Sequence, residues 1–96
     1  MMLEKDIEKK LCEEVNKVGG KCLKLISPSW AGIPDRLVLM PKGRLGFVEL
    51  KAPGKKPRKL QEKRIQELLK LGFKVYTVDS YDECKRVAHR IRGDSY

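Results

Sequence analysis

Two carboxylates and one ammonium group near the middle of the chain have the types and the spacing needed to hold a divalent metal ion beside a phosphate. The first carboxylate closes the segment Gly32-Ile33-Pro34-Asp35, and the other two groups stand in Glu49-Leu50-Lys51. Carboxylate oxygens suit Mg²⁺ or Mn²⁺, and an ammonium group can stabilise negative charge that develops on a phosphate. These groups indicate metal-assisted hydrolysis of a phosphodiester bond, which is the chemistry of a nuclease.

A β-hairpin would bring the two carboxylates together. Residues 35–40 and 45–51 are apolar, strand-like runs, and the turn-forming residues 41–44 separate them. If the hairpin closes with Asp35 opposite Glu49, their Cβ atoms lie roughly 4.5 to 5.5 Å apart. Two carboxylates that close can share one metal ion, whose positive charge removes their mutual repulsion.

The same register decides which other groups share the face of Glu49. Side chains alternate along a strand, so Lys51 emerges beside Glu49, while Leu50 points away and leaves its backbone carbonyl nearby. Four apolar residues of that face are predicted to be core residues packed under a helix: Leu37, Leu39, Leu45 and Phe47. The charged cluster should therefore lie at the end of an apolar face, where burying a charge is costly without a partner.

These residues also have a purely structural interpretation. Asp35 could cap a turn after Pro34, and Glu49 with Lys51 could be an exposed ion pair on an edge strand. Short motifs of this kind occur often by chance. The hairpin spacing between the two motifs favours the catalytic interpretation.

The motifs and their order resemble the PD-(D/E)XK nuclease superfamily, and within it the VRR-NUC domains related to Holliday-junction resolvases. The resemblance covers nearly the whole chain. It rests on Glu8 in a first helix, Gly32-Ile33-Pro34-Asp35 opening a strand, Glu49-Leu50-Lys51 on the next strand, and Gln61 near the start of the following helix. It implies one α/β domain over residues 1–96 with a restriction-endonuclease-like fold, a mixed four-stranded sheet flanked by helices.

The resemblance also implies roles for the residues of the two motifs. Asp35 and Glu49 would bind Mg²⁺ or Mn²⁺, and the backbone carbonyl of Leu50 would complete the metal site. Lys51 would orient or activate the attacking water.

Two further roles implied by the resemblance have alternatives. Glu8 would support the metal site from the first helix, but Glu4 stands one helical turn earlier and could reach the same surface. The spacing of Glu8 is closer to the resolvase-like pattern. Gln61, ten residues after Lys51, would belong to the catalytic group, although an exposed glutamine bonded to water is the commoner fate of this residue type.

Helices and strands must position these groups, and the apolar pattern predicts the order α-β-β-β-α-β-α. An apolar stripe over residues 3–18, followed by two glycines, predicts the first helix, and residues 21–27 follow as the first strand. Residues 57–71 should form the second helix and residues 73–78 a short buried strand, which together with the hairpin make a right-handed crossover. Residues 80–83 match a capping box that begins the last helix.

The charge of the chain fits an anionic partner. The formal net charge is +9 and the isoelectric point is near 9.6, so the protein should bind DNA with an affinity that falls as salt rises. A loop rich in proline and glycine follows the second motif and leads into a helix, which offers both cations and backbone donors to phosphate. The residues predicted to contact phosphate there are Lys55, Lys56, Arg58 and Lys59.

Trp30 lies in the loop before the first motif. Its ring could stack on a base or insert at a branch point of DNA, because aromatic faces bind unstacked bases. It could instead pack against the core or form a dimer contact, since tryptophan is highly buried on average.

Other kinds of site find little support in the sequence. Cys12, Cys22 and Cys84 have no metal-ligand spacing and are expected to be reduced, and His89 is the single histidine. No segment is long and apolar enough to cross a bilayer, and the N-terminus lacks a signal-peptide pattern. We expect a cytoplasmic protein, nucleoid-associated or phage-encoded, with neither a membrane contact nor a small-molecule cofactor.

These observations predict a metal-dependent DNA endonuclease, selective for branched DNA such as four-way (Holliday) junctions in repair or recombination. A homodimer with two such sites could cut a junction symmetrically, as the resemblance to resolvases implies. One alternative is a nucleic-acid-binding module that keeps the fold but does not cut, which the joint presence of Asp35, Glu49 and Lys51 disfavours. The other is a nuclease of another specificity: nicking, flap-cleaving or restriction-type.

Overall fold

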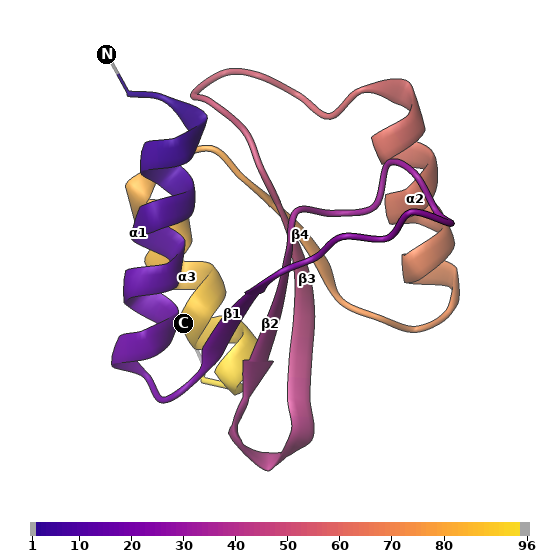
Figure 1. The fold of residues 1–96 in the computed structure, drawn as a ribbon. Coiled ribbons are helices and arrows are strands. Elements are labelled where there is room, and N and C mark those ends of the chain that lie inside the picture. The colour runs from indigo at the N-terminus through magenta and orange to yellow at the C-terminus, as the bar shows by residue number, and fades with distance from the viewer. Residues whose placement is uncertain (1, 95–96) are drawn as a thin grey trace.

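The computed structural model describes residues 2–94 as a mixed sheet with helices on both of its faces (Figure 1). The elements in chain order are α1 (Glu4–Lys17), β1 (Lys21–Lys24), β2 (Arg36–Met40), a short 3₁₀ turn (Pro41–Gly43), β3 (Arg44–Leu50), α2 (Lys59–Lys70), β4 (Val75–Val78) and α3 (Tyr81–Arg92). The predicted order α-β-β-β-α-β-α is confirmed, and so is the predicted α/β fold class.

The four strands follow one another across the sheet in the order β1-β2-β3-β4. β1, β2 and β3 form an antiparallel meander, and α2 carries the chain across so that β4 runs parallel to β3. β2 pairs with β3 so that Arg36 lies opposite Val48 and Leu37 opposite Phe47. One more step along both strands places Asp35 opposite Glu49, which is the register that the sequence predicts.

β1 is shorter than predicted, since it ends at Lys24 and not at residue 27. The backbone nevertheless stays beside β2 for one more residue, because Leu25 N–H donates a hydrogen bond to the Asp35 carbonyl at 2.9 Å. This bond fixes the backbone of Asp35 just before β2 begins.

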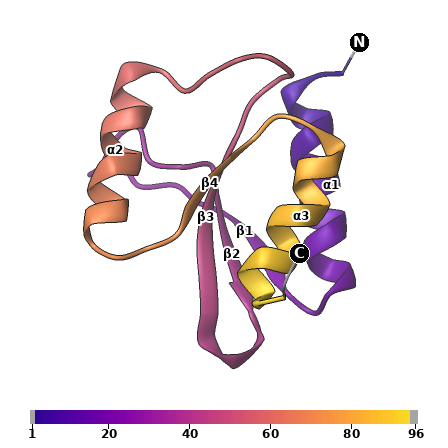
Figure 2. The ribbon, with the colours of Figure 1, turned by 180° about the vertical axis from the view of Figure 1, so that it is seen from behind.

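The main core lies between the sheet and two helices. α1 and α3 lie together against one face of the sheet, and α2 lies on the other, as the two opposite views agree (Figures 1 and 2). α1 contributes the apolar stripe that the sequence predicts, and the core consists of Ile7, Leu11, Val15, Val38, Met40, Val48, Leu50, Val78, Cys84, Val87, Ala88 and Ile91.

The prediction that the face of Glu49 holds the core was wrong for the main core. That core includes none of Leu37, Leu39, Leu45 and Phe47, although all but Leu39 are partly buried on the side of α2. Val38 and Val48, which alternate with the predicted core residues, have no exposed surface, whereas Leu39 is 36% exposed. Both faces of the hairpin are apolar, so alternation alone cannot tell which one a pair of helices will cover. α2 covers its face only in part, and among its described residues Leu68 alone is buried. The face that carries Asp35 and Glu49 is therefore the more open one.

Gly46 allows α3 to approach β3 closely. A Cβ atom at this position would lie 2.9 Å from Cδ1 of Ile91, which is closer than packed carbon atoms come. Ile91 is 2% exposed and belongs to the main core. The absence of a side chain at Gly46 thus sets the distance between α3 and the sheet.

We expect Gly46→Ala to lower the free energy of unfolding by about 1 to 3 kcal/mol, because the new methyl group must displace Ile91. Ile91→Val removes the crowded Cδ1 atom, so the double variant should be less destabilised than the sum of the two single variants. Urea denaturation of the three variants measures this coupling. Strictly additive effects would contradict the close approach.

Candidate active site

Asp35 stands where β2 begins and β3 ends, and its carboxylate is held by the neighbouring strand. Oδ2 of Asp35 accepts a hydrogen bond from Leu50 N–H at 2.9 Å. Pro34, immediately before it, is fully buried, and proline fixes the backbone φ angle at this position. The side chain and the backbone of Asp35 are therefore both positioned before any ligand binds.

The strand register also explains why a proline lies opposite Leu50, whose carbonyl is the predicted metal ligand. Continuing the pairing of β2 with β3 places Pro34 opposite Leu50. In an antiparallel ladder the carbonyl of Leu50 would accept a hydrogen bond from the residue opposite it, but proline has no N–H group. The strand pairing thus provides no donor for the Leu50 carbonyl, which fits its predicted role as a metal ligand.

Glu49 is a buried carboxylate without a hydrogen-bond donor. Its residue has no exposed surface, and neither of its oxygens accepts a hydrogen bond from any group in residues 2–94. Lys51 Nζ lies 3.1 Å from Oε2 as an ion pair, outside hydrogen-bond geometry. The pKa of Glu49 is raised to about 7, first by burial and then by the negative charge of Asp35, while Lys51 opposes the rise.

This environment fits a hard cation. A buried carboxylate is normally paired and also hydrogen-bonded, but Glu49 has only the ion pair with Lys51 and no hydrogen bond to either oxygen from residues 2–94. Asp35 adds a second carboxylate and Leu50 a carbonyl, so all the donors are oxygens, as Mg²⁺ and Mn²⁺ prefer. Within residues 2–94, however, no three His, Cys, Asp or Glu side chains gather to hold a metal ion. The structure brings together two of the predicted carboxylates and not the third.

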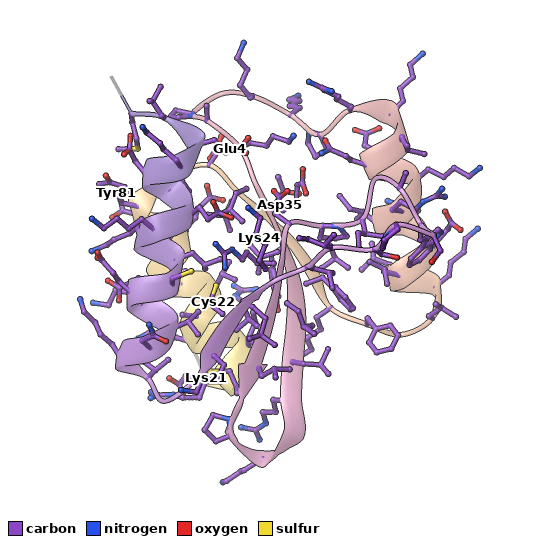
Figure 3. All side chains as sticks on the ribbon, in the orientation of Figure 1. Glu4, Lys21, Cys22, Lys24, Asp35 and Tyr81 are labelled. Carbon is purple, nitrogen blue, oxygen red and sulfur yellow. The ribbon has the colours of Figure 1, made fainter. Side chains whose placement is uncertain are left out.

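Glu8 lies on the other face of the sheet from Glu49. Its Oε2 accepts a hydrogen bond from Arg36 Nε at 2.8 Å, and Arg36 follows Asp35, so its side chain points to the opposite face. Glu4 is exposed, and Figure 3 shows it at the N-terminal end of α1, toward the same end of the fold as Asp35 in this view. The choice between Glu4 and Glu8 stays a prediction.

Gln61 caps the first turn of α2. Its Oε1 accepts a hydrogen bond from the backbone N–H of Arg58 at 2.8 Å. Such a bond satisfies one of the free donors at a helix start. Gln61 therefore has a structural role, and its catalytic role stays a prediction.

The predicted phosphate-binding loop is exposed and anchored at one point. Lys55, Lys56, Arg58 and Lys59 are all exposed. The anchor is Asp79, whose Oδ2 accepts a hydrogen bond from Gly54 N–H at 3.1 Å. Sequence reasoning missed Asp79, although it directly follows the strand that lies parallel to the Glu49 strand.

Trp30 is held against α2 by Arg64. The Arg64 guanidinium carbon lies 5.3 Å from the centre of the Trp30 ring, and Arg64 Nε donates to the Ala31 carbonyl at 2.7 Å. The loop comes so near α2 that a Cβ atom on Gly32, which has φ +84°, would lie 2.7 Å from Leu60 Cγ. Trp30 is only half-buried, so this packing leaves part of its ring open to a ligand.

The cysteines are free thiols. Burial raises the pKa of the Cys22 thiol, and the neighbouring Cys12 adds to the rise. Burial also raises the pKa of Cys84 to about 12. Thiols with raised pKa values are weak nucleophiles and weak metal ligands at neutral pH.

Known proteins resemble this chain in sequence and in fold. No model of a known protein family matches the chain. The protein named "Putative nuclease p44" of Acyrthosiphon pisum secondary endosymbiont phage 1 is 46% identical over 82 residues, which cover 85% of this chain and 88% of that protein. A solved structure described as "VRR_NUC domain" matches with a TM-score of 0.83 and 30% identity, over 91% of this chain and 95% of the other.

The chain belongs to the VRR-NUC family. The resemblance predicted from the two motifs is thus confirmed, together with the VRR-NUC fold that it implied. Within residues 2–94, this VRR-NUC chain contains no helix that is both long and apolar enough to span a membrane.

In EDTA, Glu49→Gln should stabilise the protein at pH 8 and have less effect at pH 5. The raised pKa of about 7 means that the folded state favours protonated Glu49. The stability that the protonated carboxyl group adds to the folded state is fully present below the ordinary pKa of 4.5, and it is lost as the pH rises through about 7. At about 1.4 kcal/mol per pKa unit, the free energy of unfolding of Glu49→Gln at pH 8 should exceed that of the wild type by roughly 1 to 3 kcal/mol.

Urea denaturation at four pH values between 5 and 8 measures this dependence, with Glu13→Gln as an exposed control. Adding Mg²⁺ should stabilise the wild type and not Glu49→Gln, since a ligand that binds only the folded state raises its stability. An equal effect of Glu49→Gln at pH 5 and pH 8 would show that the carboxylate is not perturbed.

Proposed function

We propose that this VRR-NUC chain is a metal-dependent endonuclease that hydrolyses phosphodiester bonds in DNA. The observation that carries the proposal is the buried carboxylate of Glu49, which lies opposite Asp35, has Lys51 as its charge partner and has no hydrogen-bond donor. The names of the similar phage protein, "Putative nuclease p44", and of the matching VRR_NUC domain support a nuclease.

The proposed metal site uses oxygens that the fold has already positioned. Asp35, Glu49 and the Leu50 carbonyl would hold Mg²⁺ or Mn²⁺. Of the two predicted carboxylates of α1, Glu8 would first have to leave Arg36 on the other face of the sheet, whereas Glu4 is exposed. When bound, the ion polarises the phosphate and lowers the pKa of a water molecule. Leu50 N–H keeps the Asp35 carboxylate in place at 2.9 Å, which reduces the reorganisation that binding requires.

Lys51 would act on the phosphate and the attacking water. Its side chain is only 12% exposed, and its Nζ lies beside Glu49 at 3.1 Å. Its backbone N–H donates to the Val78 carbonyl at 2.9 Å, so β4 fixes the end of β3 where Lys51 stands. An ammonium group held in this way stabilises the negative charge that develops during hydrolysis.

The basic loop would hold the DNA backbone beside these groups. Four exposed cations follow Lys51 within one loop and the first residue of α2, and the net charge of +9 adds a general attraction to DNA. A loop that Asp79 anchors at Gly54 can present its lysines to phosphate at a lower entropic cost than a free loop.

We further propose that the substrate is branched DNA such as a four-way junction, and that the protein acts as a homodimer. Large apolar residues are exposed on the open sheet face, among them Leu23 at 45%, Leu39 at 36% and Phe73 at 41%. The hairpin extends beyond the end of α2 in both views (Figures 1 and 2). A second copy could cover this face, and a two-fold pair would present two sites to a symmetric junction.

Lys51→Ala and Asp35→Asn should each lower the cleavage rate by roughly 10²- to 10⁴-fold, because each removes a charge that acts on the reacting groups. Cleavage is measured with Mg²⁺ or Mn²⁺ on four-way, nicked, flapped and linear duplex DNA. Lys9→Ala, which changes an exposed lysine of α1, is the matched control and should cut normally.

Each outcome of this assay decides one part of the proposal. Equal activity of the wild type and Lys51→Ala on every substrate would refute the catalytic assignment. Cutting confined to one sequence in linear duplex would refute junction selectivity. Binding without any cleavage when metal is supplied would identify a non-cleaving module.

The proposed dimer predicts that Leu39→Glu shifts the protein toward the monomer, because a buried carboxylate without a partner is costly at an interface. Leu3→Glu is the matched control, since Leu3 is 43% exposed but lies before α1. Sedimentation equilibrium measures the dissociation constant of each variant. A wild type that stays monomeric at all concentrations would contradict the dimer.

A further inference from the structure

The arginines of this chain divide into those that carboxylates neutralise and those that remain available. Arg36, Arg64 and Arg92 are each paired with a carboxylate at 2.6 to 2.8 Å. Arg86 and Arg90 are exposed on α3, and no carboxylate in residues 2–94 forms an ion pair with either of them. They lie one helical turn apart, so their guanidinium groups can face the same ligand.

Arg86 and Arg90 line a hollow at the edge of the sheet. The residues of β4 that share this hollow are Tyr76 and Thr77. A second hollow, which continues from Tyr76 and Arg90, is lined by Lys74. The hollows therefore follow the outer edge of β4, beside α3 and the end of α2.

A third hollow lies along the same edge of β4, on the side of α2. Thr77 lines this third hollow together with Lys59 and Lys63. Shared residues thus join the three hollows into one groove, which we call the β4 groove: Lys59, Lys63, Lys74, Tyr76, Thr77, Arg86 and Arg90.

Acidic residues of the β4 groove are few, and most are already engaged. Asp94 is paired with Arg92 at 2.6 Å. Glu83 accepts hydrogen bonds from Ser80 Oγ and Asp79 N–H at the start of α3. Glu62 is the remaining carboxylate of the lining. Because the bonds to Glu83 come from neutral donors, its charge remains, and five cations face the two carboxylates Glu62 and Glu83 that no arginine or lysine of residues 2–94 neutralises.

The β4 groove also offers backbone donors and runs beside the candidate site. Lys74 and Val78 accept hydrogen bonds from β3 through their carbonyls, so the alternate residue Thr77 directs its N–H away from β3, toward the groove. Thr77 pairs with Glu49 in the parallel register of β3 and β4. Backbone N–H groups, hydroxyls and arginines are common ligands of DNA phosphates.

We propose that the β4 groove binds the phosphate backbone of a second segment of the DNA substrate through Arg86, Arg90, Lys74 and Lys63, while Lys59, where the groove meets the basic loop, belongs to the first segment. The identity of the substrate rests on the proposed function. The other ligand that an open strand edge can bind is an added β-strand of a protein. Such a strand would need acidic side chains placed opposite Arg86 and Arg90, whereas every nucleotide of DNA carries a phosphate, so the charge of the groove favours nucleic acid.

Arg86→Gln/Arg90→Gln tests the groove, with Lys21→Gln/Lys24→Gln as the matched control. The control removes the same charge from β1, the opposite edge of the sheet. Fluorescence anisotropy in EDTA measures binding of a synthetic four-way junction between 50 and 200 mM KCl. The slope of log affinity against log salt should fall by about 2 in the groove variant, because each phosphate contact contributes roughly 0.9. Urea denaturation checks that both variants fold.

The outcomes separate this inference from the proposed function. An equal change of slope in both double variants would overturn the groove, since total charge would then explain binding. A wild type that cuts DNA, together with a groove variant of unchanged slope, would refute the groove alone. A wild type that binds with the predicted dependence on Arg86 and Arg90 but never cuts would support the groove and refute the nuclease.

Discussion

The pairing of β2 with β3 is the constraint on which the candidate site depends. Val48 and Leu50 lie on either side of Glu49 in the sequence and are buried under α1 and α3, with 0% and 1% of their surfaces exposed. A shift of β3 by one residue would turn these two side chains out of the core and bring Glu49 into it. The core therefore fixes Glu49 on the other face, opposite Asp35, even though its carboxylate has no donor there.

The two faces of the sheet consequently serve different purposes. The face under α1 and α3 holds the main core, while the face under α2 holds the carboxylates, Lys51 and much exposed apolar surface. α2 is attached to this face largely through Leu68, Arg64 and the loop that packs at Gly32. An element with few buried contacts opens more easily than the core, so α2 and the basic loop are the parts that can adjust to a nucleic-acid substrate.

The local pattern of the sequence was enough to predict the hairpin, its register and the element order, because strand alternation and turn residues act over short distances. It could not predict the buried face, since Leu37 and Val38 are equally apolar and the choice depends on where α1 and α3 pack. The sequence also could not show on which face of the sheet Glu8 lies. Its partner Arg36 is distant in sequence, and only the assembled sheet shows that Arg36 points away from its neighbour Asp35. The short capping bond of Gln61 could have been recognised from its place at the third position of α2.

The two sequence motifs are best understood as one structural unit that spans both strands. The N–H and the carbonyl of Leu50 both point toward β2. The first motif places Asp35 beside the N–H and Pro34 beside the carbonyl. Asp35 accepts the N–H through its side chain, while Pro34, opposite Leu50 in the register, has no N–H to give to the carbonyl. Any other residue at position 34 could extend the ladder and occupy that oxygen. Proline followed by aspartate therefore positions one carboxylate and leaves one carbonyl without a strand partner, which explains why these two residue types must precede β2 together.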